Sequence, residues 1–525
     1  MKVELLGALD YAKLKEILKG IVGDSEEELA FVDEIIEAIE QLEKAERAIK
    51  VAAAGGLSNF KGNVFDKISS VRAEDYDEVV AFIKRVLKLG HDSITDHDYL
   101  LFAIQDVSPV IEQTIIAERF SSFTIKSRRL VDFSKAGFYV PDFHDKNGNI
   151  LPNNEELKDI YTNYMQGLFN KYADFLGVGI EPEDARFVLP YCYNSNIIMG
   201  VDAHALKDMI IKYTKTHLSK IQELREFGWR LYEIAKKHVP YIIDEIDKTP
   251  YQETDSVRDF IDERVGDKIP DYDFMAKPVM LNKPQNVDDY ILIYALMRRY
   301  NIELDQAKKV LEEMSEEDPN FKTDLMRKII KEGDGLELKQ VNFEFQIPQS
   351  FAVLTHLTRH RTHPIMAQEF VPNPNLEYYI TPPAIQAKCA KEFDEVFTNN
   401  KIMYDMFKNE YGVCEEDLVY FTLSGNLSHT VTNLDGGTLK HILGLRECPK
   451  AQWETQAMAR GLHEELDKLE GAEIFSSIIG PNCKITGVCR ERKSCGLVNK
   501  YKENEEVQTG DNKVLAKAPE SEINK

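Results

Sequence analysis

The sequence predicts an α+β fold made of two tandem copies of a helix-rich domain, each with a small antiparallel sheet. Helical periodicity dominates the chain, but short β-rich runs at Tyr99–Ile104 and Val341–Ile347 are each followed by a polar break. A pattern of polar residues also occurs twice in the sequence, once around each of these runs. At 525 residues, the chain exceeds what a single hydrophobic core normally supports. We therefore expect at least two domains, supplied by the duplication.

Apolar residues at helical spacing predict the elements around the two strands. An amphipathic helix within residues 26–50 lies outside the repeated pattern. Pro449 suits the first turn of the last expected helix. The remaining predicted helices cover residues 205–213, 218–238, 288–300, 304–313 and 451–469. The expected organisation is an N-terminal helical arm (1–50), a first copy (51–243), a connection (244–284), a second copy (285–496) and a disordered tail (497–525).

Composition narrows the class of protein. A content of 43% hydrophobic and 29% charged residues is typical of a globular protein, and no run of roughly 20 apolar residues suits a membrane helix. The formal net charge of −24 argues against nucleic-acid binding, which needs a surplus of Lys and Arg. The N-terminus does not resemble a secretory signal, so the seven cysteines are read as reduced thiols. We expect a cytoplasmic protein that binds no nucleic acid and no membrane.

Each copy of the repeated pattern keeps polar residues that the other has lost. The first copy contains Gly90-His-Asp-Ser-Ile-Thr-Asp-His97 and, after the strand, the segment 117–129 ending in Ser127-Arg-Arg129. The second copy contains Arg359-His360-Arg361 and Leu445–Glu454. Short stretches at 126–129 and 359–361 gather arginine and stand out against the acidic background of the chain. The complementary losses predict one site that draws residues from both copies.

At these residues the chain resembles the flavin-dependent thymidylate synthase family, in a tandem form. Ala117 and Glu118 depart from it, standing where the family has arginine and histidine, and Thr124 and Ile125 replace its asparagine and glutamate. A carboxylate at Glu118 would repel a phosphate or pair internally with an arginine. The residues that match the family's motifs are Gly90, His91, Ser93, His97, Arg119, Ser122, Ser127 and Arg129 in the first copy, and Arg359, His360, Arg361, Leu445, Arg446, Ala451 and Gln452 in the second.

The resemblance implies a methyltransferase that converts dUMP to dTMP with FAD, NADPH and methylenetetrahydrofolate. The family is a homotetramer, so a tandem chain is expected to form a homodimer with two composite sites. Arginine suits the nucleotide phosphate because its planar fork donates bidentate hydrogen bonds. The implied catalytic residues are Arg359, Arg446 and Arg129; the substrate-binding residues are Ser127, Arg129, Arg359 and Arg446; the cofactor-binding residues are Ser93, His97, His360, Arg361 and Gln452.

Two other functions stay open at this point. A flavin enzyme acting on another pyrimidine nucleotide would keep the phosphate site and change the base pocket around Thr124, Ile125 and Met366. A decayed enzyme fold would serve as a nucleotide-binding scaffold. An isolated histidine such as His97 is more often a hydrogen-bonded core residue than a ligand.

A separate signal lies near the C-terminus. Cys483, Cys489 and Cys495 are evenly spaced among glycine and turn residues, and Cys448 is a candidate fourth member. Their thiolates predict a structural zinc site. An iron–sulfur cluster uses the same ligands, and reduced cysteines in a loop are an equal alternative.

Overall fold

The computed structural model describes most of the chain, and its contacts form two units. Unit 1 comprises Met1–Tyr272 and Glu369–Leu427, and unit 2 comprises Asp273–Gln368 and Ser428–Lys525. No helix among the described residues is long and apolar enough to cross a membrane. The described residues are 1–6, 11–22, 25–71, 75–118, 120–252, 254–265, 268, 274–360, 362–367, 369–371 and 376–502.

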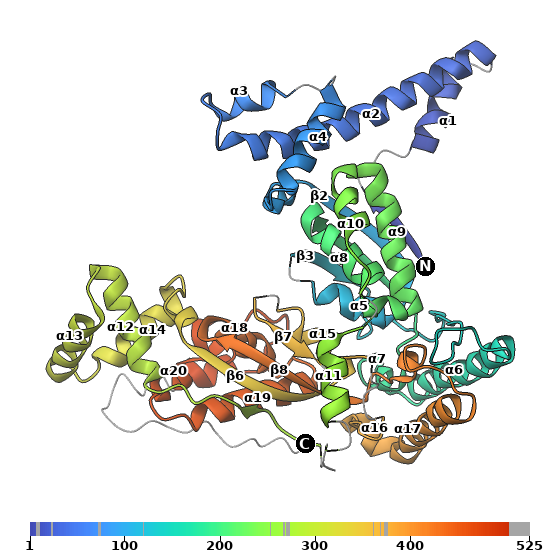
Figure 1. Ribbon diagram of the computed structural model, residues 1–525. Coiled ribbons are helices and arrows are strands. Elements are labelled where there is room, and N and C mark those ends of the chain that lie inside the picture. The colour runs from blue at the N-terminus through green and yellow to red at the C-terminus, as the bar shows by residue number, and fades with distance from the viewer. Residues whose placement is uncertain are drawn as a thin grey trace. The chain divides into compact units, whose positions relative to one another are not determined.

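Unit 1 contains a four-stranded antiparallel sheet in the order β1-β2-β4-β3, of which Figure 1 labels β2 and β3. Alternate side chains of β2, including Leu100, Phe102 and Ile104, are buried, so one face of the sheet packs on the core. Helix α8 contacts β4, and α9 contacts β1. The bounds are β1 (Lys2–Leu6), β2 (Tyr99–Val107), β3 (Ser121–Ile125), β4 (Ser195–Asp202), α5 (Pro109–Ile116), α8 (Ala203–Lys215) and α9 (Gln222–His238).

The N-terminal helix expected within residues 26–50 is confirmed as part of α2 (Glu26–Leu57). Its first turn is capped because Ser25 Oγ accepts the Glu28 N–H and the Glu28 carboxylate accepts the Ser25 N–H. Strand β1 precedes this helix and was not predicted, so the arm begins within the first sheet. The other helices of this region are α1 (Tyr11–Val22), α3 (Val64–Ser69) and α4 (Tyr76–Leu87).

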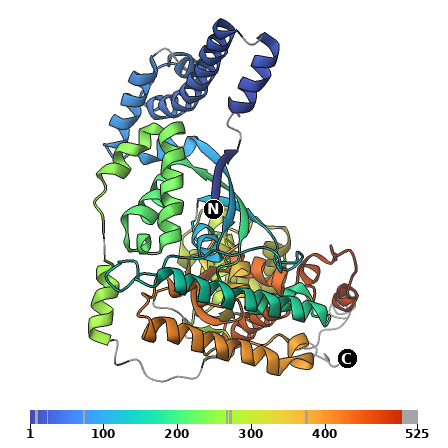
Figure 2. The ribbon, with the colours of Figure 1, turned by 90° about the vertical axis from the view of Figure 1, so that its right-hand side faces the viewer.

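Unit 1 also holds a layer of long helices drawn from both halves of the sequence. Figures 1 and 2 show α6 (Asn154–Gly177) beside α17 (Ala390–Asp405). Tyr164 donates a 3.3 Å hydrogen bond to Asn400 Oδ1, and the ring centroids of Tyr161 and Phe421 lie 5.7 Å apart. This aromatic packing places residues 369–427 in unit 1, although the sequence assigns them to the second copy.

Unit 2 repeats the strand order of unit 1, as β5-β6-β8-β7. The repetition confirms the predicted α+β fold with two copies. Its core gathers the apolar faces of the strands and helices, including Phe343, Phe345, Leu439 and Leu462. The bounds are β5 (Val279–Met280), β6 (Asn342–Ser350), β7 (Ile365–Ala367), β8 (Leu427–Asp435), α12 (Val287–Tyr300), α13 (Leu304–Glu317), α14 (Phe321–Glu332), α15 (Phe351–Leu357), α18 (Gly436–Arg446), α19 (Trp453–Asp467), α20 (Glu473–Ile478) and α21 (Asn482–Thr486).

One predicted helix start is wrong. The helix expected from residue 451 begins at Trp453, because the Gln452 side chain accepts the Thr455 N–H and acts as the cap. Pro449 therefore lies before the helix rather than in its first turn. Of the predicted tail, residues 497–502 are helical and residues 503–525 lie outside the described part of the chain. The shorter helices not yet given are α7 (Pro182–Ala185), α10 (Ile243–Lys248), α11 (Ser256–Val265) and α16 (Pro383–Lys388).

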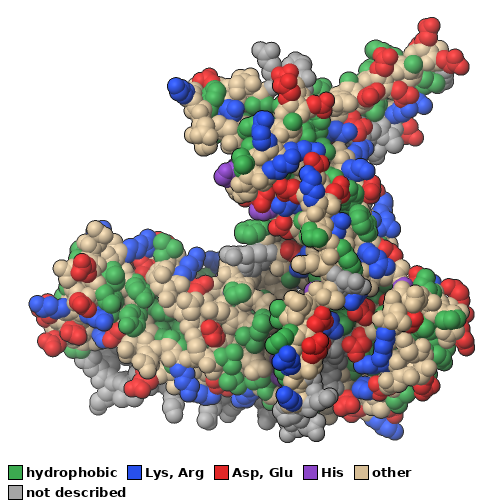
Figure 3. All heavy atoms as spheres, in the orientation of Figure 1, with side chains coloured by type: hydrophobic (Ala, Val, Ile, Leu, Met, Phe, Trp, Pro, Cys, Tyr) green, Lys and Arg blue, Asp and Glu red, His purple; other side chains and the backbone are tan. Residues whose placement is uncertain are grey.

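The face in Figure 3 shows how charge is distributed. Acidic and basic side chains are interspersed over it rather than gathered into one basic field. Among the coloured side chains of this face, no continuous stripe of Lys and Arg is visible.

Candidate active site

A buried serine–glutamate pair in each copy provides a common reference point. Ser350 caps α15, and its N–H and hydroxyl donate to Glu454 at 2.6 and 2.7 Å. Ser108 caps α5, and the same two groups donate to Glu223 at 2.8 and 2.5 Å. Each glutamate lies in the first turn of the helix that ends its copy's motif, α19 or α9. Positions in the two copies can therefore be compared by counting from these serines.

His360 and Arg446 meet in unit 2, at the ends of α15 and α18. Arg446 Nε donates to His360 Nε2 at 3.3 Å, and Arg446 Nη2 donates to the His356 carbonyl at 3.4 Å. His360 is buried, whereas Arg446 is partly exposed. The guanidinium is therefore held by the helix ends while part of it still reaches the surface of the unit.

The histidine in this pair is neutral at physiological pH. Burial, followed by the positive charge of Arg446, lowers the pKa of His360 to about 3. Because Arg446 donates to Nε2, that nitrogen carries a lone pair, and the proton of the neutral ring belongs on Nδ1. His360 thus does not offset the positive charge of Arg446.

In the first copy, different residues occupy the positions equivalent to His360 and Arg446. Counted from the reference serines, Glu118 occupies the position of His360. Counted from Asp202 and Asp435, which cap α8 and α18, Tyr213 occupies the position of Arg446. The Glu118 carboxylate accepts from Lys212 Nζ at 2.8 Å and from Tyr213 at 3.3 Å. The sequence predicts that Glu118 either repels a phosphate or pairs with an arginine inside the protein. Glu118 does form an internal pair, but its partners are a lysine and a tyrosine.

Gln452 belongs to the same region as Arg446 and His360. Its Oε1 accepts from Thr455 N at 2.8 Å, and Thr455 Oγ1 lies 3.3 Å from His356 Nδ1. Gln452 is 1% exposed, yet its Nε2 has no hydrogen-bond partner among the described residues. A buried amide donor without an acceptor is costly, so this position suits a ligand acceptor or a bound water.

A second group of buried polar residues in unit 2 was not predicted from the sequence. Gln349 Nε2 donates to Thr430 Oγ1 at 2.7 Å, and His363 Nδ1 lies 2.6 Å from Thr432 Oγ1. Thr430 and Thr432 are two residues apart on β8 and so share one face of the sheet. The first copy has Ile197 at the position of Thr430, counted from the capping aspartates. The alternation of Ser428, Thr430 and Thr432 along an inward face was the signal in the sequence.

These residues leave two buried acceptors unused. Thr432 donates its hydroxyl to the Pro364 carbonyl at 2.7 Å, so it accepts from His363 Nδ1. Burial lowers the pKa of His363, which leaves Nε2 as an acceptor. Within the described residues neither His363 Nε2 nor Gln349 Oε1 has a donor. Gln349 and His363, which contact the polar residues of β8, can therefore accept two hydrogen bonds from a molecule that carries N–H or O–H groups.

The predicted phosphate residues of the first copy lie together after β3. Arg129 N donates to Ser127 Oγ at 3.3 Å, and the partly exposed Arg129 side chain forms an ion pair with Glu183. The neighbouring Arg128 is buried and pairs with Glu112 at 2.7 Å, which makes it part of the core. An anion arriving at Arg129 would have to compete with Glu183.

Ser93 and His97 lie in a short 3-10 helix, Asp92–His97, between α4 and β2. Both are exposed, so His97 is not the buried core histidine that an isolated histidine suggests. The carboxylate of the adjacent Asp96 accepts a hydrogen bond from His204 Nδ1 at 3.0 Å. This segment is thus anchored to α8 while leaving Ser93 and His97 at the surface of the unit.

The remaining predicted residues are exposed or lie outside the described part of the chain. Arg359 is exposed at the end of α15, whereas Arg361 and Arg119 lie outside the described residues. Met366, part of the alternative base pocket, is 67% exposed on β7. Ser93, His97, Ser127 and Arg129 belong to unit 1, and Arg359, His360, Arg446 and Gln452 belong to unit 2.

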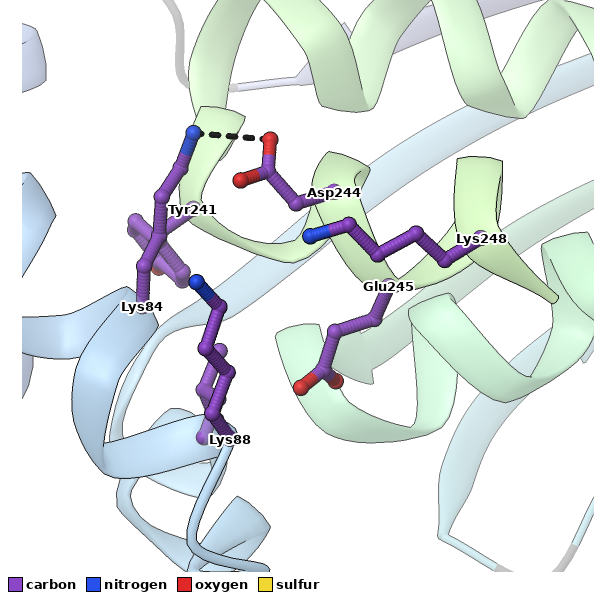
Figure 4. Close-up of a pocket in the computed structure, with 7 residues that line it drawn as sticks. Lys84, Lys88, Tyr241, Asp244, Glu245 and Lys248 are labelled. Carbon is purple, nitrogen blue, oxygen red and sulfur yellow. Dashed lines mark hydrogen bonds and ion pairs between the residues drawn. The ribbon is translucent and has the colours of Figure 1, made fainter.

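A pocket in unit 1 is lined by residues outside the motifs. Figure 4 shows Lys84, Lys88 and Lys248 around it together with two carboxylates. Lys84 Nζ pairs with Asp244 at 2.8 Å, and Glu245 pairs with Lys207 at 3.2 Å. The charges are largely compensated internally, so this pocket is not the candidate nucleotide site.

The four C-terminal cysteines are free thiols in this structure. Among the described residues, no group of three or more His, Cys, Asp or Glu side chains is arranged to hold a metal ion. The predicted zinc site stays a prediction.

Glu223 gives a testable pH dependence. Burial raises the pKa of this carboxyl from 4.5 to about 7, even though Ser108 and Tyr420 donate hydrogen bonds to it. The folded state binds more protons than the unfolded state between these values, so Glu223 makes stability fall as the pH rises from about 4.5 to 7. The loss amounts to about 3 kcal/mol.

Urea unfolding of the native protein and Glu223→Gln at pH 5 and pH 8 measures this effect. The stability difference between the two proteins should shift in favour of the glutamine variant at pH 8, because glutamine keeps an acceptor for Ser108 without a charge. An unchanged difference would show that Glu223 does not titrate in this range.

Comparison with known proteins identifies the family of the chain. Residues 37–241 and 286–469 match the family described as thymidylate synthase complementing protein. Because the two segments together span more than half of the chain, the protein belongs to this family. Each segment contains three strands of one sheet, β2, β3 and β4 in the first and β6, β7 and β8 in the second, whereas β1 and β5 lie outside the matched residues.

Individual relatives carry a more specific description. The flavin-dependent thymidylate synthase of Pyrococcus abyssi is 30% identical over 179 residues, which is 33% of this chain and 67% of that protein. The enzyme of the same description from Geobacter sulfurreducens is 30% identical over 131 residues, covering 25% of this chain and 53% of that protein. The chain therefore spans about half to two thirds of these relatives. A UMP/dUMP methylase, PolB from Streptomyces cacaoi, aligns at 19% identity and a TM-score of 0.33, covering 39% of this chain and 92% of that chain.

Proposed function

We propose that this protein is an FAD-dependent thymidylate synthase that converts dUMP to dTMP, with methylenetetrahydrofolate as carbon donor and NADPH as reductant. The observation that carries this proposal is the pairing of Arg446 with a neutral, buried His360 in a member of the family. The other copy has replaced the same pair with Glu118 and Tyr213. An anion site has thus been kept in one copy and removed from the other.

The residues of unit 2 suit a phosphorylated pyrimidine nucleotide. Arg446 and Arg359 supply charged donors for the phosphate. The free acceptors at Gln349 and His363 suit the N–H and O–H groups of a base or sugar. A cation near the pyrimidine would also stabilise negative charge that develops on the ring.

The residues present also fit a flavin. Gln452 has a buried donor without a partner, and His360 is a neutral ring that can sit beside an uncharged heterocycle. When bound, the flavin supplies the hydride for reduction of the transferred carbon. We assign Ser93, His97, His360, Arg361 and Gln452 to holding it, on the resemblance of their motifs. The chain's role is then to position the nucleotide and exclude competing reactions.

We further propose that activity requires residues of both copies and that the protein works as a cytoplasmic homodimer with two sites. The complementary motif losses support the first part, and seven free cysteines suit a reducing compartment. Arg359→Ala and Arg129→Ala should each reduce thymidylate formation at least about 100-fold, because each removes a charged phosphate donor. Refolded mixtures of the two variants should regain activity if a site crosses chains. Retention of full activity by both single variants would contradict a shared site.

An absorbance spectrum of the purified protein, followed by anaerobic NADPH addition with and without dUMP, tests the flavin function. A flavin spectrum whose bleaching responds to dUMP, followed by folate-dependent formation of dTMP, is the expected result. Bleaching that responds to another pyrimidine nucleotide would reassign the substrate. No flavin, and none taken up on reconstitution, would leave a nucleotide-binding scaffold.

A further inference from the structure

The sheet of unit 2 has polar residues on its buried face at positions where the sheet of unit 1 is apolar. Gln349, Thr430 and Thr432 are at most 2% exposed. Counted from the reference serines and the capping aspartates, the equivalent residues of the first copy are Val107, Ile197 and Met199, which are at most 3% exposed. The same strand order thus forms in one copy with apolar side chains at these positions, so the fold does not require polar ones.

The polar residues leave two acceptors unpaired that the apolar face of the first copy does not have. His363 is 8% exposed and Gln349 is 1% exposed. Within the described part of the chain, neither His363 Nε2 nor Gln349 Oε1 has a hydrogen-bond partner. A buried acceptor without a donor destabilises the folded state. Two such acceptors, in the copy that also keeps Arg446 and His360, point to a bound molecule that supplies two donors.

Neighbouring hydrogen bonds fix the direction of both acceptors. The Thr432 hydroxyl donates to the Pro364 carbonyl and accepts from His363 Nδ1, so Nε2 presents one lone pair in the plane of the ring. Gln349 Nε2 donates to Thr430 at 2.7 Å, which leaves Oε1 with two lone pairs. Thr430 and Thr432 are two residues apart on β8, a span of about 6.7 Å. The two acceptors are therefore held at a separation that suits the base and the sugar of one nucleoside.

Helix α18 connects these acceptors to the proposed phosphate residue. Thr362 Oγ1 lies 3.1 Å from Thr438 Oγ1, in the first turn of α18, so His363 follows a residue that contacts the start of this helix. Arg446 is the last residue of α18, about 12 Å further along its axis. A nucleoside monophosphate carries its base and its phosphate at opposite ends, as this arrangement of acceptors and arginine requires.

We propose that His363 and Gln349 select the nucleotide: His363 Nε2 accepts the N3–H of a uracil base, and Gln349 Oε1 accepts the 3′-hydroxyl of the sugar. Outside its phosphate, dUMP has these two donors and no others, which matches the two unpaired acceptors. A ring nitrogen with one in-plane lone pair suits the N–H of a base edge, and an amide oxygen with two lone pairs suits a rotating hydroxyl. The inference rests on the proposed function and names the groups that choose its substrate.

The same arrangement rejects cytosine. N3 of cytosine carries a lone pair in place of a hydrogen, so it would face the lone pair of His363 Nε2. A site built to pair with an N–H discriminates against a base that lacks it, because the buried group of the site is then left unpaired. Among the pyrimidine nucleotides, the uracil nucleotide is therefore the substrate that these residues accept.

Titration calorimetry of the full-length protein with nucleotide analogues tests the proposal without any variant. The probes are dUMP, dCMP, N3-methyl-dUMP and 2′,3′-dideoxy-UMP. We expect dUMP to bind at least about 100-fold more tightly than dCMP and N3-methyl-dUMP, which both lack the N3–H. It should bind about tenfold more tightly than 2′,3′-dideoxy-UMP, which lacks the 3′-hydroxyl.

Two variants assign each contact to its residue. His363→Phe should bring the affinities for dUMP and dCMP within about fivefold of each other. Gln349→Val, which introduces the residue of the first copy, should abolish the difference between dUMP and 2′,3′-dideoxy-UMP and keep the preference for dUMP over dCMP. His238→Phe is the matched control, because His238 is a histidine of unit 1 that is also 8% exposed, and it should change neither preference. Urea unfolding confirms that each variant is folded.

Two results would overturn this inference alone. One is equal affinity of the native protein for dUMP and dCMP, which would show that the two acceptors hold ordered water only. The other is an unchanged preference for dUMP in a folded His363→Phe variant. Formation of dTMP, measured separately, would still support the proposed function in both cases. Failure to bind any pyrimidine nucleotide would overturn the inference together with the proposed function.

Discussion

Replacing Arg446 with alanine should lower thymidylate formation by a factor of about 10³, with flavin content unchanged. Arg446 supplies a charged donor that a neutral His360 does not offset, and loss of a charged donor aimed at the reacting nucleotide costs several kcal/mol of stabilisation. Steady-state turnover with dUMP, together with dUMP titration of the flavin spectrum, measures the loss. Lysine at this position should recover only part of it, because an ammonium group lacks the planar fork.

The first copy provides a matched control for this prediction. Tyr213 stands at the position equivalent to Arg446, where it bonds Glu118. Tyr213→Phe removes that hydroxyl and should leave turnover within about threefold of the native value, since the Lys212 ion pair still satisfies Glu118. An equal loss of turnover in the Arg446 and Tyr213 variants would mean that these two equivalent positions do not differ in function.

The second large effect concerns the buried anchor of α15. Glu454→Leu should destabilise the protein by about 3–5 kcal/mol, because it removes the acceptors of two buried hydrogen bonds and leaves the Ser350 N–H and hydroxyl buried without partners. Urea unfolding of the native and variant proteins measures the difference.

The same helix, α19, offers the control. Glu464 is half exposed and pairs with Lys277, so Glu464→Leu should change stability by no more than about 0.5 kcal/mol. Glu454→Gln keeps one acceptor and should fall between the two. A Glu454→Leu variant as stable as Glu464→Leu would show that the serine–glutamate pair contributes nothing to the fold.

Those parts of the fold that bury a regular apolar pattern could be predicted from the sequence. Strands β2 and β6 have long alternating apolar faces, and the predicted helices of both copies have clear periodicity. Strand β5 has only two residues, and β1 and β7 are short edges whose pairing depends on the neighbouring strand rather than on their own residues. Strand β8 was hidden because its buried face carries serine and threonine.

Site residues that belong to a sequence motif could be predicted. Site residues that only the packing of strands brings to the site could not. Arg446 and His360 were both singled out, and the structure brings them together. Gln349 and His363 were missed because neither belongs to a motif and their burial arises only from strand packing. The capping role of Gln452 was also missed, since the proline ahead of it gave a competing signal for the helix start.

The long-helix layer of unit 1 has a consequence for synthesis on the ribosome. Unit 1 is completed by Glu369–Leu427, and α17 supplies part of the aromatic packing around α6. The N-terminal half therefore cannot reach its final packing when residue 272 leaves the exit tunnel, as an independent leading domain would. It must wait until about 155 further residues have been translated, from 273 to 427. A messenger truncated between the halves should yield a polypeptide whose exposed aromatic face binds chaperones, whereas the same cut would be harmless in two domains arranged end to end.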